Sequence, residues 1–289
     1  MSGETRTLEA RGRRFILGPR LWLMGVLNVT PDSFSDGGAY FDPGKAIDRG
    51  LALAAEGADI IDVGGESTRP GSRPVPEAEE IGRVIPVLRA LRPKVQALLS
   101  IDTTKAGVAR AALEAGADIV NDTSALRSDP SMADVVAGSG AALVLMHMQG
   151  TPLTMQDAPH YDDLMGEIAA FLDERIRAAE AAGIPAERII IDPGIGFGKT
   201  FEDNLEILRG QRAFRRLGRP LLVGFSRKAF LGRILGLPPA ERLEATIAAA
   251  VLSAERGADI LRVHDVGPVA RAVRTAEAIL GTGGAGHVR

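Results

Sequence analysis

The chain of 289 residues contains no cysteine. Disulfide bonds, thiolate metal sites and a cysteine nucleophile are therefore excluded. Long apolar runs are also lacking, because the segment 21–27 (LWLMGVL) is far too short to span a bilayer. Pro19 and Arg20 interrupt the run before this segment, unlike the core of a signal peptide. The net charge is only −3, so we expect a cytoplasmic protein that binds neither nucleic acid nor a membrane.

Common nucleotide and hydrolase motifs are missing too. The segment 194–198 (GIGFG) does not have the glycine spacing of a dinucleotide fingerprint. Gly198, Lys199 and Thr200 resemble the end of a P-loop, but Pro193 stands where the first glycine of that motif belongs. The sequence contains no HExxH, EF-hand or GxSxG motif. It therefore does not favour nucleotide binding, zinc proteolysis or serine hydrolysis.

What the sequence does contain is a repeated pattern of helix, glycine and strand. Gly57, Gly116 and Gly257 each follow an alanine-rich stretch and precede Ala-Asp-Ile. Glycine suits the left-handed position that ends a helix, and the apolar residues after it suit a strand buried on both faces. The pattern predicts strands alternating with helices, as in a parallel sheet.

Eight such units are predicted along the chain. The strands are expected near 22–28, 58–63, 95–101, 117–121, 141–146, 188–192, 220–225 and 258–263. The helices are expected near 43–57, 76–91, 104–115, 131–138, 161–183, 201–217, 240–257 and 267–280. We predict an α/β fold with one (β/α)8 TIM-barrel domain over 1–289, including an N-terminal extension (1–20) and a frayed tail (281–289). The alternative, an open doubly wound sheet, requires a phosphate fingerprint that is absent.

Each predicted strand ends in a polar or ionisable residue. In chain order these are Asn28, Asp62, Asp102, Asn121, His147, Asp192, Ser226 and His264. Buried polar groups cost free energy unless they are paired, and in a barrel all eight ends meet at the catalytic face. The sequence therefore predicts one active site at the carboxyl ends of the strands.

Two long loops follow the first two strands. The segments 28–38 (NVTPDSFSDGG) and 64–71 (GGESTRPG) are rich in Gly, Ser, Thr and Asp. Connections in barrels are usually short, so these segments are predicted to be mobile active-site loops rather than plain turns. They would place Phe34, Ser67, Thr68 and Arg69 over the site.

These loops, together with Asp102 and the segments 121–122, 145–150, 192–199, 224–230 and 262–266, resemble dihydropteroate synthases, a pterin-binding TIM-barrel family. The resemblance runs from about Leu23 to Val266. It implies a transferase of folate biosynthesis, a sulfonamide target, that joins 6-hydroxymethyl-7,8-dihydropterin diphosphate to p-aminobenzoate and releases diphosphate. It also implies a homodimer, although the apolar segments 244–257 and 267–280 suit inward packing equally well.

The resemblance implies a set of pterin-binding residues: Asp102, Asn121, Asp192, Lys228, Met146, Phe197 and Gly224. A carboxylate accepts two ring donors at once, so Asp192 would bind the 2-amino and N3–H edge. Asn121 would bind the 2-amino/N1 edge, because an amide both donates and accepts. Lys228 would donate to O4 and N5, and Asp102 would lie near N8. The alternative is that the carboxylates cap helices and that Lys228 is a solvated charge.

The resemblance assigns the diphosphate to Asn28, Arg69, Arg262 and His264. Asn28 would also bind Mg2+ through its amide oxygen, because magnesium keeps several waters and is often held partly by substrate phosphates. An ion pair with Asp265 is a second role open to Arg262. The implied catalytic residues are Asp102, Lys228, Arg262, His264 and Arg69, acting in a dissociative displacement of diphosphate.

The arylamine is assigned a separate set of residues: Thr68, Ser226, Phe34, Pro70, Phe197 and Lys228. Ser226 and the amides of the following helix would bind its carboxylate. His147 suits a structural hydrogen bond better than a catalytic role. Two alternatives keep the pterin barrel: a methyl transferase acting on a corrinoid, and a pterin-binding protein without turnover. The Ser67–Arg69 loop and the pair of Arg262 and His264 argue against the first alternative. The second is disfavoured by the presence of Asn28, Asp102, Arg69 and Lys228. A generic phosphate-binding metabolic barrel is the remaining alternative.

Overall fold

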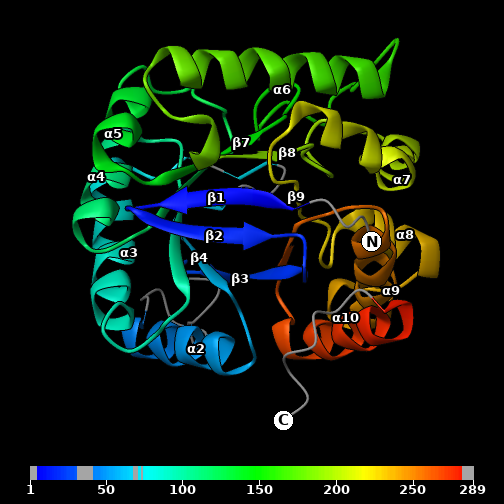
Figure 1. Ribbon diagram of the computed structural model, residues 1–289, viewed down its shortest axis with the longest axis horizontal. Coiled ribbons are helices and arrows are strands. Elements are labelled where there is room, and N and C mark those ends of the chain that lie inside the picture. Colours follow the sequence, from blue (N-terminus) through cyan, green and yellow to red (C-terminus); the bar gives the residue numbers. More distant parts are fainter. Residues whose placement is uncertain (1–4, 31–41, 68–70, 73, 282–289) are drawn as a thin grey trace.

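A computed structural model describes residues 5–30, 42–67, 71–72 and 74–281. Its parallel strands are β3 (Trp22–Asn28), β4 (Ile60–Gly64), β5 (Leu98–Asp102), β6 (Ile119–Asp122), β7 (Ala142–Met146), β8 (Ile189–Asp192), β9 (Leu222–Val223) and β10 (Ile260–Val263). They pair in the order β8-β7-β6-β5-β4-β3-β10-β9. An isolated parallel bridge between Ile191 and Leu221 joins the two edge strands. The result is a nearly closed barrel, which confirms the predicted fold class (Figure 1).

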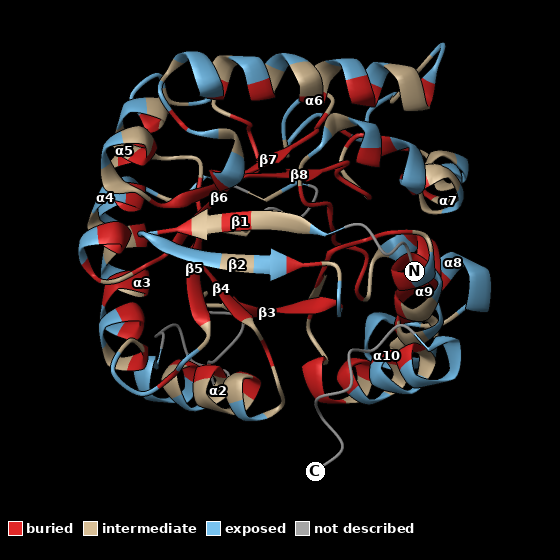
Figure 2. Cartoon of the chain, viewed as in Figure 1, coloured by how far each residue is buried: buried red, intermediate tan, exposed pale blue. Residues whose placement is uncertain are grey.

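Helices surround the barrel on the outside. They are α2 (Pro43–Ala55), α3 (Glu77–Leu91), α4 (Ala106–Glu114), α5 (Met132–Ser139), α6 (Leu164–Ala181), α7 (Phe201–Gly210), α8 (Ala229–Leu235), α9 (Leu243–Glu255) and α10 (Val266–Leu280). Figure 2 shows buried residues on the strands and on the inner sides of the helices, with exposed residues on the outer sides of the helices. None of the helices in the described part of the chain has the length and apolar character needed to traverse a bilayer.

Two of the predicted elements differ from the structure. The helix expected over 201–217 ends as α7 at Gly210, and a 3-10 helix continues over Gln211–Leu217. The strand expected over 220–225 is shortened to β9, and α8 follows it over Ala229–Leu235 before the expected helix begins as α9. The apolar residues of α8 were hidden from the sequence pattern because the helix has only seven residues, fewer than a periodic signal needs.

An antiparallel hairpin covers the amino end of the barrel. It consists of β1 (Arg6–Ala10) and β2 (Arg13–Leu17), which cross in front of the barrel in Figure 1. Leu8, Ala10 and Leu17 are buried in one cluster with inward side chains from the amino-terminal halves of the barrel strands. Sequence analysis assigned no element to this stretch, because two five-residue strands offer too few alternating positions to stand out.

The barrel interior changes from apolar to polar along each strand. Side chains two residues apart on a strand point to the same face. Accordingly, Ile60, Ile119, Ile190 and Ile260 belong to the apolar cluster above the hairpin. The residues two positions later on the same strands are Asp62, Asn121, Asp192 and Arg262. The alternation of the strands therefore brings these four polar residues to the interior at the carboxyl end.

Candidate active site

A buried network of charges lies where β4, β5, β6 and β10 end. Arg262 Nε donates to Asp62 Oδ2 at 2.7 Å, and Arg262 Nη2 donates to Asp102 Oδ2 at 2.7 Å. Asn121 Nδ2 donates to the same Asp62 oxygen at 3.0 Å. Asp62 is fully buried, and Asp102 and Asn121 are 6% and 4% exposed. Asp62, a strand-end residue for which the sequence suggested no role, therefore joins Asn121 to Arg262, and Arg262 in turn binds Asp102.

The network contains unsatisfied polar atoms. Oδ1 of Asp62 and Oδ1 of Asp102 are buried without a hydrogen-bond partner among the residues that the structure describes. Burial raises the pKa of Asp102 to about 7, although the Arg262 charge acts in the opposite direction. The Arg262 pKa is raised, because the attraction of Asp62 and Asp102 outweighs its burial. Orphaned buried oxygens are costly, and they are a common feature of sites that bind a polar ligand.

Asp192 ends β8 on the other side of the interior. Its Oδ1 accepts from Gly194 N at 2.7 Å, whereas Oδ2 receives no hydrogen bond from any described residue. Burial raises its pKa; the Gly194 amide and the charges of Lys228, Lys199 and Arg262 oppose that shift. Asp192 thus accepts from the turn after its strand and presents its other oxygen, whereas the following helix α7 is capped by Thr200. The alternative that Asp192 caps this helix is therefore wrong.

Lys228 lies directly before α8 and points back into the barrel. Its Nζ donates to Ile195 O and lies 4.4 Å from the centroid of the Phe197 ring. Burial lowers the Lys228 pKa to about 7, partly opposed by Asp192. The alternative of a solvated surface lysine is therefore wrong. The Lys228 ammonium, the Phe197 ring beneath it and the Asp192 carboxylate thus lie together, beside the Arg262 network.

The last strand and the loop before α8 also meet. Ser226 Oγ accepts from His264 N at 3.2 Å and lies 3.1 Å from His264 Nδ1. Arg227 has a left-handed backbone with φ 57° and binds Asp265 through two hydrogen bonds, at 2.8 and 2.5 Å. The partner of Asp265 is therefore Arg227, and the alternative pairing of Asp265 with Arg262 is wrong.

The family described as pterin binding enzyme matches residues 24–264. A dihydropteroate synthase of Synechocystis sp. is 47% identical over 266 residues, covering 92% of each chain. The chain belongs to this family. It is a pterin-binding barrel of the dihydropteroate synthase kind, as the resemblance implied.

Two solved structures agree with this assignment. The Xanthomonas albilineans dihydropteroate synthase with 4-aminobenzoic acid is 47% identical, has a TM-score of 0.89, and is matched over 96% of this chain and 99% of that one. The enzyme of the same organism in complex with 7,8-dihydropteroate is 45% identical, with a TM-score of 0.82 and coverage of 92% and 96%. The similarity thus extends over nearly the whole barrel.

In this family member, the glycines of 194–198 serve packing rather than nucleotide binding. Gly194 and Gly198 have φ of 68° and 62°, which side chains rarely adopt. A Cβ on Gly194 would lie 1.8 Å from His147 O, and one on Gly198 would lie 2.6 Å from Gln149 O. The glycines allow this loop to lie directly on the chain that follows β7.

Three further predicted residues lie at the same end of the barrel. Met146 ends β7, pairs with Asp192 in register, and packs with Met148, Met155 and Phe197. A Cβ on Gly224 would be 3.6 Å from Arg262 Cβ. Asn28 ends β3 beside Gly64, which in turn pairs with Asp102. The structure therefore brings these residues into the neighbourhood of the charged network.

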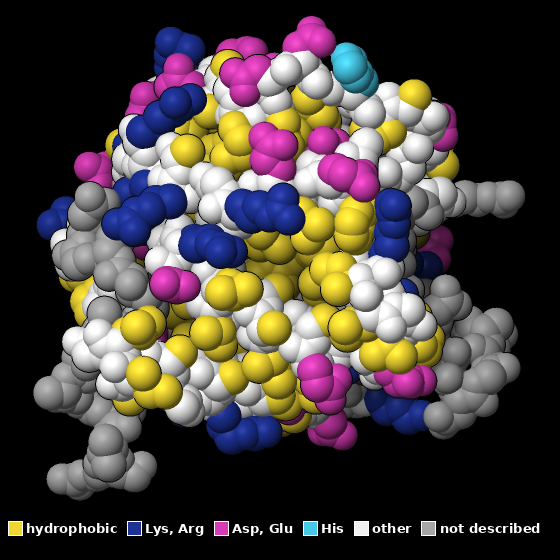
Figure 3. Space-filling view, turned by 90° about the vertical axis from the view of Figure 1, so that its right-hand side faces the viewer, with side chains coloured by type: hydrophobic (Ala, Val, Ile, Leu, Met, Phe, Trp, Pro, Cys, Tyr) yellow, Lys and Arg dark blue, Asp and Glu magenta, His cyan; other side chains and the backbone are white. Residues whose placement is uncertain are grey.

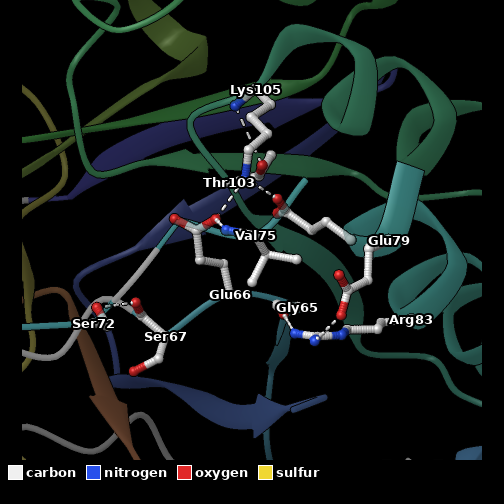
Figure 4. A network of polar contacts seen from close by, with 10 residues as sticks. Gly65, Glu66, Ser67, Ser72, Val75, Glu79, Arg83, Thr103 and Lys105 are labelled. Carbon is white, nitrogen blue, oxygen red and sulfur yellow. Dashed lines mark hydrogen bonds and ion pairs between the residues drawn. The ribbon is translucent and has the colours of Figure 1, made fainter. Parts of the chain in front are cut away.

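The predicted residues Phe34, Thr68, Arg69 and Pro70 lie outside the described residues. The base of the second loop is described, and Figure 4 shows it. Glu66 Oε2 accepts from Val75 N at 2.7 Å and from Lys105 Nζ at 2.6 Å. Lys105 also binds the fully buried Glu80, and Arg83 Nη1 donates to Gly65 O at 2.7 Å. Polar contacts from α3 and from the start of α4 hold both ends of this loop.

Sequence reasoning missed Glu66 and Lys105 as contributors to the site. Neither residue ends a strand, and the pattern offered no sign that residues 39 positions apart would meet. Asp62 was visible as a strand-end carboxylate, but nothing in the sequence indicated that it would bind Asn121 and Arg262.

No group of three or more His, Cys, Asp or Glu residues in the described ranges has the arrangement of a metal site. A single oxygen ligand remains compatible with magnesium, which prefers oxygen, keeps waters and binds substrate phosphates. Asn28 is half-buried, carries an amide oxygen and lies two strands from Asp102. Its chemistry and position fit the predicted single ligand.

Proposed function

We propose that the protein condenses 6-hydroxymethyl-7,8-dihydropterin diphosphate with p-aminobenzoate to form 7,8-dihydropteroate and diphosphate. The observation that carries the proposal is the arrangement of Arg262, which lies between two buried carboxylates and beside Asn121 at the carboxyl end of the barrel. The related synthases with 4-aminobenzoic acid and with 7,8-dihydropteroate support it. The single barrel domain, 1–289, would contain the whole site.

Pterin recognition is assigned to the inward polar residues. Asp192 Oδ2 accepts the 2-amino and N3–H edge as a charged acceptor. Asn121 gives one amide hydrogen to Asp62 and offers its other amide hydrogen and Oδ1 to the neighbouring 2-amino/N1 edge. Lys228 turns from Ile195 O towards O4 and N5, and Asp102 lies near N8. Met146, Phe197 and Gly224 supply the surfaces against which the ring packs.

The diphosphate is assigned to Asn28, Arg69, Arg262 and His264. Arg262 uses Nε and Nη2 for Asp62 and Asp102, and its Nη1 donates to no described residue. Nη1 is therefore the group that we assign to a diphosphate oxygen. When bound, Mg2+ adds positive charge to the diphosphate, with Asn28 as its protein ligand. No other metal ligand is proposed.

The arylamine would bind next to the pterin, towards the loops. Ser226 is buried and bonded to His264, so both are held at the edge of this region. The Lys228 ammonium lies over the Phe197 ring. This ring and the stem of Lys228 would pack against the ring of p-aminobenzoate. The assignments of Phe34, Thr68 and Pro70 to this ring, and of Ser226 to its carboxylate, stay predictions.

The catalytic residues would act on the two ends of the bond between the pterin methylene and diphosphate. Arg262, His264 and Arg69 stabilise the departing negative charge, while Asp102 stabilises the positive methylene that forms on the pterin. Lys228 holds the pterin in place for both stages. Fixed charges of opposite sign at two ends of a breaking bond favour dissociation. The arylamine nitrogen then attacks the methylene and loses its proton to water.

Turnover is the direct test of this function. Purified protein with dihydropterin diphosphate, p-aminobenzoate and Mg2+ should form 7,8-dihydropteroate and release one diphosphate for each product molecule. Pterin binding without diphosphate release would instead indicate a binding protein, and methyl transfer from a methyl-folate would indicate a corrinoid-linked enzyme.

We also propose a cytoplasmic homodimer. The apolar side chains of Leu252 on α9 and of Ile279 and Leu280 on α10 are exposed, as are Ile234 and Leu235 on α8. Figure 3 shows apolar side chains gathered on the side of the molecule that these helices occupy. Exposed apolar surface of this kind favours association. Sedimentation equilibrium should give twice the mass of the chain.

A further inference from the structure

Lys199 is a buried amine that none of the roles above uses. It follows the glycine loop of 194–198 and is only 3% exposed. Its Nζ lies 3.0 Å from His147 Nδ1 and donates to Phe197 O at 2.9 Å. No carboxylate in the described ranges lies within ion-pair distance of it. A buried amine with two neutral partners is costly, so its position requires a physical reason.

The partner of Lys199 is an acceptor at all physiological pH values. Burial and the neighbouring Lys199 charge lower the His147 pKa to about 2, so the imidazole stays neutral. Its ring packs edge-on against Phe171, with 4.8 Å between centroids. While Lys199 is protonated it can only donate to Nδ1, which places the ring proton on Nε2. This arrangement gives His147, whose role the sequence left open, a structural function.

Lys199 thereby connects two parts of the pterin pocket. The His147 end of the contact adjoins Met146, and His147 N donates to Asp192 O at 2.9 Å. Lys199 Nζ also donates to the backbone carbonyl of Phe197, and the Lys228 ammonium lies over the ring of the same residue. The Nζ of Lys199 thus binds both His147, which follows β7, and the loop that contains Phe197.

Lys199 also acts on Asp192 through its charge. The charges that face Asp192 are Lys228 before α8, Arg262 on β10 and Lys199 after the glycine loop. All three favour the ionised carboxylate, against its burial. Burial lowers the pKa of Lys199 itself to about 7, aided by the Lys228 charge and opposed by Asp192 and by Asp203 on α7. Lys199 therefore carries its positive charge most fully on the acid side of neutrality, the range in which Asp192 would take up a proton.

We propose that Lys199 is a positioning residue of the pterin site: it fixes the Phe197 loop on β7 and supplies positive charge that keeps Asp192 ionised. It acts through these residues and does not touch substrate. The inference rests on the proposed pterin site and adds to it a residue that selects the charge state of the pterin-binding carboxylate.

The test measures binding of 6-hydroxymethylpterin by calorimetry at a series of pH values from neutral into the acid range. In Lys199→Met the Asp192 pKa should rise, so binding should be lost at a higher pH as the solution is acidified, by about one pH unit. Affinity at pH 7 should fall about tenfold. The KM for p-aminobenzoate should change much less than the KM for the pterin substrate.

Two matched variants separate charge from packing. Tyr161→Phe removes another tie to the same loop, the hydrogen bond from its hydroxyl to Gly198 O at 2.7 Å, without changing any charge at neutral pH. In this variant, the pH at which pterin binding is lost on acidification should be the same as in the wild type. Lys94→Met removes an exposed lysine and should behave as the wild type. If Lys199→Met lowers thermal stability but leaves the pH of this loss and the affinity at their wild-type values, the inference is overturned.

A second pair of variants covers the case in which Lys199→Met does not fold. His147→Leu removes the acceptor of the Lys199 contact and should weaken pterin binding, whereas His147→Asn keeps an oxygen near the place of Nδ1 and should lose less. Equal affinity in the two variants would overturn the inference. Wild-type protein that fails to bind the pterin would overturn the proposed function itself, which distinguishes the two failures.

Discussion

Asp62 and Asn121 are joined by a hydrogen bond of 3.0 Å from the amide nitrogen to the carboxylate, deep inside the barrel. The same oxygen of Asp62 accepts from Arg262. One fully buried carboxylate therefore sets the direction of an amide assigned to the pterin and of a guanidinium assigned to the diphosphate. Loss of Asp62 should therefore weaken binding of both the pterin ring and the diphosphate of the same substrate.

The first prediction follows from that shared oxygen. Asp62→Asn keeps the shape of the side chain but removes a charge-assisted acceptor, so pterin affinity and kcat/KM should each fall by about 1.5–3 kcal/mol. Calorimetry and steady-state kinetics would measure the two effects. Ser100→Ala is the matched control, because Ser100 pairs with Asp62 in register and its buried hydroxyl has no partner among the described residues. Similar losses in both variants would contradict a specific role of Asp62.

Arg262 is predicted to act mainly on the diphosphate. Arg262→Ala should lower kcat/KM for the pterin diphosphate by about 2–5 kcal/mol, since truncation leaves two buried carboxylates unpaired. Arg262→Lys should recover little of this activity, because an ammonium does not provide the forked donors that bridge Asp62 and Asp102. Unchanged kcat/KM in the alanine variant would remove Arg262 from the site.

Asp192 is predicted to decide pterin binding. Asp192→Asn replaces a charged acceptor by an amide that offers donors to the donor edge of the ring, so binding of 6-hydroxymethylpterin should be abolished. Its folded structure should persist, because an amide oxygen still accepts from Gly194 N. Calorimetry together with circular dichroism would measure both properties, and wild-type affinity in a folded variant would defeat the assignment.

The raised pKa of Asp102 should make the free energy of unfolding depend on pH. Because burial raises this pKa to about 7 in the folded protein, the folded state holds the proton more tightly than the unfolded chain does. The stability that Asp102 contributes is therefore present below its ordinary pKa and is lost as the pH rises through about 7. Asp102→Asn does not titrate, so its free energy of unfolding relative to the wild type should increase between pH 4 and 7.5. Urea denaturation at several pH values would show this, and a constant difference would refute it.

The base of the second loop yields a prediction that needs no substrate. Lys105→Met removes the cation that holds Glu66, so the Glu66 contact to the Val75 amide should loosen. Hydrogen exchange at Val75 should then become faster, while pterin affinity should stay near that of the wild type. Arylamine KM should rise, since this loop carries residues assigned to that substrate. Unaltered exchange at Val75 would show that Lys105 does not hold the loop.

Much of the fold and the position of the site followed from the sequence, because both depend on local periodicity. The alternation of side chains along a strand places Asp62, Asn121 and Asp192 inside the barrel. A glycine at the end of three helices (Gly57, Gly116 and Gly257) marks the approach of the next strand. Pairings between distant residues do not follow from periodicity. The contacts of Arg262 with Asp62 and Asp102 span 200 and 160 residues, and the sequence suggested Asp265 as its partner instead.

Short elements and buried lysines were the other features that the sequence concealed. The hairpin of β1 and β2 and the seven-residue α8 are too brief for a periodic signal. Lys199 was considered only as the end of a P-loop, since nothing in its neighbours indicates that it turns inward to His147. The roles assigned to individual residues remain predictions that the variants above would decide.

The hairpin under the barrel has a consequence for the order of events in catalysis. Because it closes the amino end with Leu8, Ala10 and Leu17, both substrates must enter and both products must leave through the opposite mouth. A pteroate molecule that lingers there blocks the next pterin as well as the next arylamine. Dihydropteroate should therefore inhibit competitively against either substrate.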